Sequence, residues 1–371
     1  MNMPIESHQS ILQRQHMNEH VGRHCYNVAL SFHDNTTMPI LDVADFEILT
    51  VLGRGSFSEV LLVQDKKQNA GEPRDELALK RLSQNAMEDS QTFIRGATDL
   101  ISEAKLLANL NHKHIIRLHG VSSHDDELKS CYTSDNCYCL FLDRLYGTVE
   151  EKFKSLRSRK NPQMTRQDVL QNLIHIALPI STTLAYLHSL KIIFRDLKPT
   201  NMGFDSNGIL KLFDFGLARE LPSETCQHQM TGRTGSRRYM APEVALSQKY
   251  GLSADTYSFG VFLFECLTLA VPFDGMSIAD HQQCVVRRRF RRSFPVPCHA
   301  PRLVQKLVKK CWSHSSQRRP DMDRVQEVLT QAIVTYDTDK ELEQGTKYLR
   351  RRISPRNSSK TPFDLFSSLI P

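Results

Sequence analysis

The sequence predicts an α+β fold with two lobes: a small lobe made mainly of β-strands with one helix, and a larger lobe made mainly of helices. Two patterns carry this prediction. From Phe46 to Leu145, short apolar runs alternate with turns that contain glycine and charged residues, as expected for strands. Beyond residue 145, apolar residues recur at helical spacing over longer stretches. A chain of 371 residues can hold two such lobes and terminal extensions.

The composition is that of a globular protein, with 40% hydrophobic and 24% charged residues. The net charge of +7 is modest, so we expect no nucleic-acid partner. Nine cysteines without framework spacing favour reduced thiols and a cytoplasmic or nuclear location. The longest apolar run, Tyr257–Phe273, contains Glu265 and falls short of the ~20 residues that a membrane span needs. We therefore expect no membrane insertion.

The first strands surround a turn that contains glycine. Phe46–Leu52 is typical of a strand, and Gly53–Val63 of a turn followed by a returning strand. Gly53 and Gly55 would let the backbone approach phosphate oxygens closely. This spacing is a weak signal by itself, because most such pairs form ordinary hairpin turns. The glycines lead into a strand rather than a helix, which separates the turn from a dinucleotide-binding fingerprint.

A lysine on the next predicted strand is a candidate for binding phosphate. Leu77–Leu82 carries Lys80, and an amphipathic helical segment that contains Glu103 follows it. The apolar face of that segment consists of Leu100, Ala104, Leu107 and Ala108. An ion pair between Lys80 and Glu103 would hold the ammonium group where it can meet phosphates. The alternative is an exposed strand lysine without such a role.

The small lobe ends in a connection to the larger one. Asn111–Ile116 predicts a turn into a strand, and a solvated helix end explains its two histidines better than a metal site does. Residues 122–136 are charged and polar, which favours a hairpin tip. Cys139–Leu145 is then expected to be a buried strand that runs into the connection.

The larger lobe starts with a helical pattern that leads to the most informative stretch of the chain. The apolar residues at helical spacing are Val169, Leu173, Ile176, Ala177, Ile180, Leu184 and Leu187. The stretch that follows contains Asp196, Lys198 and Asn201, and a second carboxylate, Asp214, lies between two phenylalanines. Phosphoryl transfer to a hydroxyl needs a carboxylate, a cation and oxygen ligands for a hard divalent metal. The sequence therefore predicts a phosphotransfer site here.

Phe194–Asn201 and Asp214–Gly216 resemble two motifs of the eukaryotic protein kinases, the catalytic loop H-R-D-L-x-x-x-N and the metal loop D-F-G. Either motif alone could be a surface loop, whereas both in this order indicate the family. The resemblance extends from about Phe46 to Ala332 and implies the two-lobed protein kinase fold.

Three short blocks in the larger lobe are most similar to the tyrosine-kinase-like group of serine/threonine kinases. These blocks are Tyr257–Val261, Cys311-Trp312 and Arg319-Pro320. The resemblance implies an N-lobe with hinge at 45–145 and a C-lobe at 146–335. Residues 1–44 lack sustained periodicity and the chain turns polar beyond about Asp337, so we expect a flexible N-terminal arm at 1–44 and a basic, disordered tail at 336–371.

The resemblance also implies an activity and its residues. The expected function is ATP- and Mg²⁺-dependent transfer of the γ-phosphate to serine or threonine hydroxyls of protein substrates, in intracellular signalling. Asp196 would orient and deprotonate the acceptor hydroxyl, Lys198 would stabilise the phosphoryl group, and Asn201 and Asp214 would hold Mg²⁺. The nucleotide would be bound by Leu52, Gly53, Gly55, Ser56, Val60, Ala78, Lys80, Glu103, Asp143, Leu145 and Asp214. For Asp143 and Leu145, the backbone would contact the adenine edge.

Three departures from the family pattern favour an alternative, a nucleotide-binding pseudokinase scaffold. Ser58 stands at the usual third glycine, Phe194 at the usual histidine, and Gly203 where a larger apolar residue normally lies under the adenine. The departures leave the polar residues intact, so we expect an active enzyme. Phe194 should keep its place in a buried column, which the resemblance completes with Leu107, Leu118 and Phe215.

The resemblance further predicts contacts that support and regulate the site. Asp255 would hold the backbone of the catalytic loop, and Arg319 would pair with Glu243. Arg195 could reach a phosphate on Thr231 or Thr234, in the polar segment Leu217–Tyr239. The alternative is that Arg195 only caps local carbonyls. The basic run Arg287–Arg292 is either a solvated face or a docking surface for an acidic partner.

Overall fold

The computed structural model describes residues 38–55, 57–66, 76–122, 138–160, 163–222 and 228–336. Most of the predicted arm and tail, the predicted hairpin tip and Ser56 lie outside the described residues. No helix within these ranges combines the length and the apolar character that a membrane span requires.

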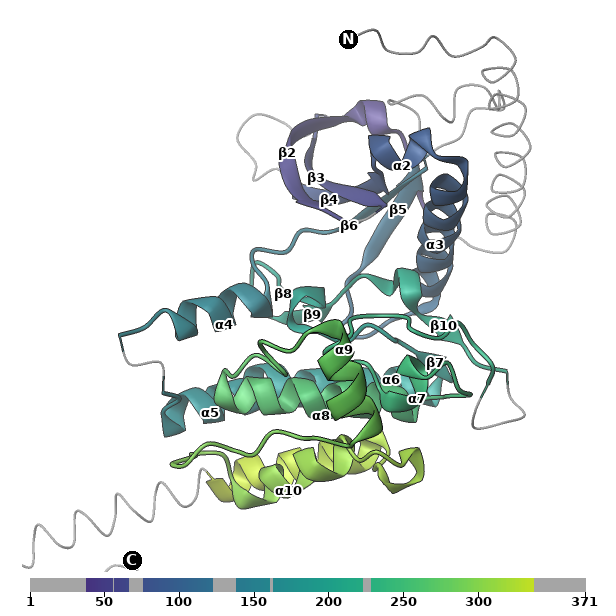
Figure 1. Cartoon of the computed structure of the whole chain (residues 1–371). Coiled ribbons are helices and arrows are strands. Elements are labelled where there is room, and N and C mark those ends of the chain that lie inside the picture. Colours follow the sequence, from purple (N-terminus) through teal and green to yellow (C-terminus); the bar gives the residue numbers. More distant parts are fainter. Residues whose placement is uncertain are drawn as a thin grey trace, which may run out of the picture.

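The N-terminal part is a six-stranded sheet with the order β1-β5-β6-β4-β3-β2, drawn in purple and blue in Figure 1. Its strands are β1 (Ile40–Leu41), β2 (Phe46–Arg54), β3 (Ser58–Asp65), β4 (Glu76–Leu82), β5 (Leu118–Ser122) and β6 (Cys139–Asp143). Neighbouring strands are antiparallel except at the edge, where β1 runs parallel to β5. A 3-10 turn, η1 (Val43–Asp45), precedes β2. The predicted strands are confirmed, with bounds that shift by one or two residues.

Two helices, rather than the predicted one, accompany this sheet: α2 (Gln84–Glu88) and α3 (Ser90–Asn109). The break falls at Asp89, whose side chain accepts a hydrogen bond from the backbone N–H of Thr92 at 2.8 Å and caps α3. The predicted face of α3 is buried at Leu100, Ala104 and Leu107. Figure 1 shows α3 standing beside the sheet and reaching towards the C-terminal part.

The C-terminal part is mainly helical (Figure 1). Its helices are α4 (Val149–Arg157), α5 (Arg166–Asn172), α6 (Leu178–Ser189), α7 (Pro242–Ala245), α8 (Ser253–Thr268), α9 (Ile278–Asp280), α10 (Arg302–Cys311) and a last helix at 322–336. Its shorter segments are η2 (Leu173–Ala177) and η5 (His281–Arg287), which are π-helical, and the 3-10 turns η3 (Pro199–Asn201), η4 (Phe215–Leu217) and η6 (Ser316–Arg318). Two small antiparallel sheets pair β7 (Ile192–Ile193) with β10 (Arg219–Glu220), and β8 (Met202–Phe204) with β9 (Leu210–Leu212).

The predicted helix from Val169 to Leu187 is present but contains the π-helical segment η2. The segment lies directly before Leu178 and Pro179, and proline has no N–H to donate to the carbonyl of His175 four residues earlier. A missing bond inside a helix is a known cause of such local rearrangement.

A continuous core joins the two parts. Helix α8 is buried almost along its whole length, from Ala254 to Leu267. Closer to the sheet, Phe194 and Phe215 are fully buried, with ring centroids 5.1 Å apart in an edge-on arrangement. Leu107 and Leu118 are buried in the same cluster. The prediction that Phe194 keeps an aromatic packing role is therefore confirmed.

Candidate active site

The residues predicted for phosphotransfer come together through the small hairpin β8–β9. Its strands pair Met202 with Leu212, so Asn201 at one end and Phe213 at the other become neighbours. The backbone N–H of Phe213 donates to the carbonyl of Asn201 at 3.0 Å. Asp214 is the next residue, so this hairpin brings the two sequence motifs to one place.

Asp196 is the centre of this site and is only 7% exposed. Its Oδ2 accepts hydrogen bonds from Lys198 Nζ at 2.6 Å and from Asn201 Nδ2 at 3.1 Å. Its Oδ1 accepts one from the backbone N–H of Ser236 at 2.8 Å. A charged carboxylate with three donors is held in one orientation, so the predicted trio is a connected group in space.

The backbone under Asp196 is held by Asp255, as predicted. Asp255 accepts hydrogen bonds from the N–H groups of Phe194 at 2.8 Å and Arg195 at 2.9 Å. Arg195 has a φ of 71°, which is an unfavourable conformation for a residue other than glycine. His188 Nε2 lies 3.1 Å from the same carboxylate, a contact that no sequence motif indicates. Asp255 therefore fixes a strained turn next to Asp196.

Lys80 lies between two carboxylates. Its Nζ is 2.7 Å from Glu103 Oε2 and 2.7 Å from Asp214 Oδ1, which confirms the predicted contact with Glu103. Burial alone would lower the pKa of Lys80, but Glu103 and Asp214 together raise it. Burial raises the pKa of Glu103, whereas the ammonium group of Lys80 lowers the pKa of Asp214. Lys80 thus stays protonated.

Asp214, which contacts Lys80, and Asn201, which contacts Asp196, carry oxygen atoms with the chemistry of ligands for a hard cation. The carboxylate of Asp214 is 45% exposed. The amide nitrogen of Asn201 donates to both the carbonyl and the carboxylate of Asp196, which leaves the amide oxygen of Asn201 for another partner. A carboxylate and an amide oxygen are ligands that Mg²⁺ accepts, so the residues fit the ion that the sequence implies.

The predicted nucleotide residues of the sheet line the turn between β2 and β3 and the adjacent strands. In the register, Gly53 pairs with Val60, and Val60 pairs with Lys80. A Cβ on Gly53 would have no atom within 4 Å, so no packing contact explains the glycine. Gly55 donates its N–H to the carbonyl of Ser58 at 2.7 Å, and Ser58 therefore closes the turn.

Leu52 and Ala78 are also in this region. Leu52 lies at an irregularity of β2 between Val51 and Gly53 and is exposed. Ala78 is buried and pairs with Leu142 on β6.

The connection between the lobes contains Asp143, whose backbone is predicted to contact the adenine edge. Its backbone N–H donates to the carbonyl of Arg117 at 3.1 Å, so a contact of Asp143 with adenine would be made by its backbone carbonyl. The physical reason is the antiparallel pairing of β5 with β6, which brings Arg117 alongside Asp143. Within the described part of the chain, the backbone of Leu145 has no hydrogen bond and stays open to a ligand.

The absence of a side chain at Gly203 is explained by its contacts with the connection between the lobes. A Cβ on Gly203 would lie 2.8 Å from Leu145 Cδ1 and 3.1 Å from the carbonyl oxygen of Gly147. Real Cβ contacts of 2.8 Å do not occur without a shift of the neighbour. The side chain of Leu145 thus occupies the volume that a larger residue at position 203 would need. This departure from the family pattern is compensated, and the sequence showed only the missing side chain.

Arg195 reaches the segment predicted to regulate the site. Its Nη1 donates to Thr231 Oγ1 at 3.2 Å and to the hydroxyl of Tyr250 at 3.3 Å. Its Nε also donates to the carbonyl of Leu217 at 2.5 Å, so Arg195 caps a local carbonyl as well. Thr234 Oγ1 lies 3.1 Å from Thr231 Oγ1.

The predicted pair of Arg319 and Glu243 is confirmed as a bidentate contact, with distances of 2.5 and 2.8 Å. The basic run Arg287–Arg292 divides in the structure. Arg287, Arg288 and Arg289 are exposed, whereas Arg291 donates to the carbonyls of Trp312, Val285 and Phe290.

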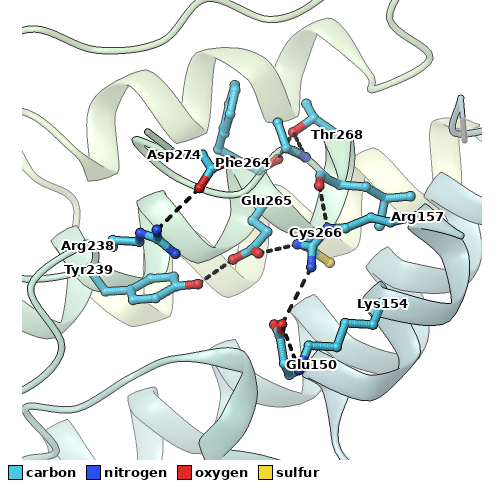
Figure 2. Close-up of polar contacts among 12 residues, drawn as sticks. Glu150, Lys154, Arg157, Arg238, Tyr239, Phe264, Glu265, Cys266, Thr268 and Asp274 are labelled. Carbon is cyan, nitrogen blue, oxygen red and sulfur yellow. Dashed lines mark hydrogen bonds and ion pairs between the residues drawn. The ribbon is translucent and has the colours of Figure 1, made fainter. Parts of the chain in front are cut away.

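Figure 2 shows a polar network beside the segment that precedes α7, which the sequence did not indicate. Tyr239 donates its hydroxyl to Glu265 on α8 at 2.5 Å. Arg157 on α4 bonds the other oxygen of Glu265 and lies 3.6 Å from Glu150. Burial raises the pKa of Glu265 to about 7. The network joins α4, α8 and the segment around Tyr239.

Comparisons with known proteins agree with this geometry. A family model described as the protein kinase domain matches residues 46–331. Ribosomal protein S6 kinase alpha-3 of Homo sapiens is 32% identical over 285 residues, covering 76% of this chain and 35% of that protein. Ribosomal protein S6 kinase alpha-1 of Homo sapiens is 31% identical over 285 residues, with the same shares. Ribosomal protein S6 kinase 2 alpha of Gallus gallus is 32% identical over 271 residues, covering 72% of this chain and 32% of that protein.

The chain spans about a third of the length of the curated relatives that it matches. These relatives are named ribosomal protein S6 kinases, so they give no support to the predicted tyrosine-kinase-like subgroup.

Proposed function

The chain belongs to the protein kinase family, and we propose that it transfers the γ-phosphate of ATP to serine and threonine hydroxyls of protein substrates. One observation supports this most strongly. Asp196, Lys198 and Asn201 form a hydrogen-bonded group, and Asp214 joins it through the β8–β9 hairpin. These are the groups that phosphoryl transfer to a hydroxyl requires.

We assign the acceptor side of the reaction to Asp196. An acceptor hydroxyl that donates to Asp196 Oδ1 or Oδ2 would be oriented towards the phosphoryl group, and the carboxylate would take its proton. Lys198 already bonds the same carboxylate at 2.6 Å. Its ammonium group is therefore close enough to the acceptor to stabilise the charge of the transferred phosphoryl group.

The nucleotide side is assigned to Lys80, Glu103, Asp214 and Asn201. Glu103 holds Lys80 at 2.7 Å, so that the ammonium group can bind phosphate oxygens. Asp214 and Asn201 would hold Mg²⁺ through their oxygens. When bound, Mg²⁺ supplies positive charge that neutralises the phosphate oxygens. We also propose that Leu52, Gly53, Gly55, Val60, Ala78 and the backbone of Asp143 and Leu145 surround the nucleotide.

We propose the division into an N-lobe with hinge at 45–145 and a C-lobe at 146–335. Nothing in the comparisons favours the pseudokinase alternative, because the relatives are named as kinases. Two of the departures that could favour it, Phe194 and Gly203, are balanced by packing against Phe215 and Leu145.

The choice of serine and threonine rests on Lys198, which lies two residues after Asp196 in the pattern typical of serine/threonine kinases. The test is to incubate the purified chain with ATP, Mg²⁺ and a generic protein substrate, and to analyse the phosphoamino acids formed. We expect phosphoserine and phosphothreonine. Predominant phosphotyrosine would overturn the assignment of the acceptor.

Phosphorylation of Thr231 or Thr234 is proposed as the regulatory step. The guanidinium group of Arg195 already bonds the hydroxyl of Thr231 at 3.2 Å. A phosphate there would add about −1.5 to −2 charges and three acceptor oxygens, which favour a bidentate contact with arginine.

A further inference from the structure

A positively charged segment lies directly beside Asp196. The backbone N–H of Ser236 donates to Asp196 Oδ1 at 2.8 Å, and the next two residues are Arg237 and Arg238. Consecutive Cα atoms are about 3.8 Å apart. Both arginines are therefore within reach of side chains that flank a hydroxyl bound at Asp196.

The acidic groups near this segment are already paired with the chain's own cations. Glu265 bonds Arg157, and Glu150 lies 3.6 Å from Arg157 and 3.7 Å from Lys154. Asp274 lies 3.3 Å from Arg238. Figure 2 shows these pairs together. A basic side chain of a substrate would find no carboxylate here that lacks a partner among the residues drawn.

The arginines of this segment, in contrast, are not fully neutralised by carboxylates in the described ranges. The guanidinium group of Arg237 has no hydrogen bond or ion pair with any residue in the described ranges, and its side chain is only partly buried. Arg292 donates to the backbone carbonyl of Asp274 at 3.2 Å, a contact that does not neutralise its charge. The pair of Arg238 with Asp274 is exposed on both sides, at 42% and 65%, and exposed pairs of this kind are weak.

The positive charge near this segment also affects a buried histidine. His281 is 2% exposed, and within the described residues its Nε2 has no hydrogen-bond partner. Its ring packs edge-to-face against the ring of Phe273, at 5.3 Å between centroids. Phe273 directly precedes Asp274, which both Arg238 and Arg292 contact. Burial first, and then the charges of Arg237, Arg291 and Arg238, lower the pKa of His281 to about 4. The positive charges of Arg237, Arg291 and Arg238 therefore lie close enough to His281 to disfavour its protonation.

We propose that the protein substrates carry a carboxylate or phosphate group within a few residues of the acceptor hydroxyl, and that Arg237, with Arg238 and Arg292, binds this anion. Guanidinium groups match the planar oxygens of carboxylates and phosphates with two parallel hydrogen bonds. The anion would accept hydrogen bonds from the N–H groups of Arg237. It would also compete with Asp274 for Arg238. This inference rests on the proposed kinase function, and it defines the substrate class of that same site.

The test uses one serine peptide with alanine flanks, and versions with glutamate, phosphoserine or arginine at each of three positions on either side. For every peptide, kcat/KM and binding by fluorescence anisotropy are measured. We expect at least one acidic position to raise kcat/KM about tenfold over the neutral peptide, through KM. Comparison of the glutamate and phosphoserine peptides shows which of the two anions the site favours.

The variants are Arg237→Ala, Arg237→Lys and Arg237→Glu, with Arg302→Ala as the matched control, since Arg302 is an exposed arginine at the start of α10. Arg237→Ala should lower the ratio of acidic to neutral kcat/KM about tenfold, Arg237→Lys should restore part of it, and Arg237→Glu should shift the preference to the arginine peptides. Arg302→Ala should keep the ratio. Thermal unfolding of each variant checks that it is folded.

Two outcomes separate the possible failures. The inference is overturned, with the kinase function intact, if wild type phosphorylates all peptides at the same rate. It is also overturned if Arg237→Ala and Arg302→Ala change the ratio of acidic to neutral kcat/KM equally. If the wild-type protein transfers no phosphate from ATP to any peptide, the proposed function is overturned. In that case, the affinities of the acidic peptides for wild type and Arg237→Ala test the anion site. Equal affinities for the two proteins would overturn the inference as well.

Discussion

Replacing Arg319 by methionine removes the guanidinium group that joins α7 to the loop before the last helix. The side chain of Arg319 is completely buried. It donates two hydrogen bonds to Glu243, and single ones to the carbonyls of Ser253 at 2.9 Å, Ser313 at 2.9 Å and His314 at 3.2 Å. Methionine fills much of the same volume but can donate none of these bonds.

The expected loss of stability follows from the charge that stays behind. Without Arg319, the carboxylate of Glu243 is buried and uncompensated. Removing one partner of such a pair costs about 3–5 kcal/mol of unfolding free energy. For a folded unit of this size, 1 kcal/mol corresponds to about 2–4 °C in Tm, so we expect a decrease of roughly 6–20 °C.

The assay is urea and thermal unfolding of wild type, Arg319→Met, and the double variant Arg319→Met, Glu243→Gln. The double variant should recover about 1 kcal/mol or more relative to Arg319→Met, because glutamine removes the isolated charge. A loss below about 1 kcal/mol for Arg319→Met would refute the argument. A double variant that is no more stable than Arg319→Met would show that the buried charge is not the cause.

Three further predictions concern the site and its surroundings. Asp214→Asn should weaken Mg·ATP binding and turnover together, since an amide is a poorer and uncharged ligand for Mg²⁺; unchanged affinity and rate would contradict the metal role. Phosphatase-treated protein and the double variant Thr231→Ala, Thr234→Ala should both phosphorylate peptide more slowly than untreated protein, and equal rates would exclude a switching role for Arg195. Burial raises the pKa of Glu265 from 4.5 to about 7, so the folded state binds more protons than the unfolded state in this pH range. The unfolding free energy should therefore fall as pH rises from about 4.5 to about 7; Glu265→Gln should flatten this slope in urea titrations, and an identical slope would refute the assignment.

Much of the fold and of the candidate site could be predicted, because the signals are local. Strands and helices follow from the spacing of apolar residues, and the contacts of Lys80 with Glu103 and of Asp255 with the backbone of Arg195 follow from motifs that fix both partners. The split between α2 and α3 also had a local cause, the cap at Asp89, which the periodicity of the apolar residues does not show.

The contacts that could not be predicted join residues far apart in the chain. Leu145 fills the space above Gly203, and only the folded chain shows that one residue replaces the volume of another. Arg157 and Glu265 are separated by 108 positions, and neither belongs to a motif. The backbone N–H of Asp143 is taken by Arg117 because two strands lie side by side, which depends on the register of the sheet rather than on sequence pattern.

In the proposed function, Asp196 serves the acceptor hydroxyl in phosphate transfer from ATP. The most direct measurement compares wild type and Asp196→Asn for transfer from labelled ATP to a protein substrate, with nucleotide affinity measured in parallel. Asparagine keeps the shape of the side chain but cannot take the proton, so transfer should fall at least about 100-fold while nucleotide affinity stays nearly unchanged. Phosphate incorporation by Asp196→Asn at a rate comparable to wild type would contradict this role of Asp196.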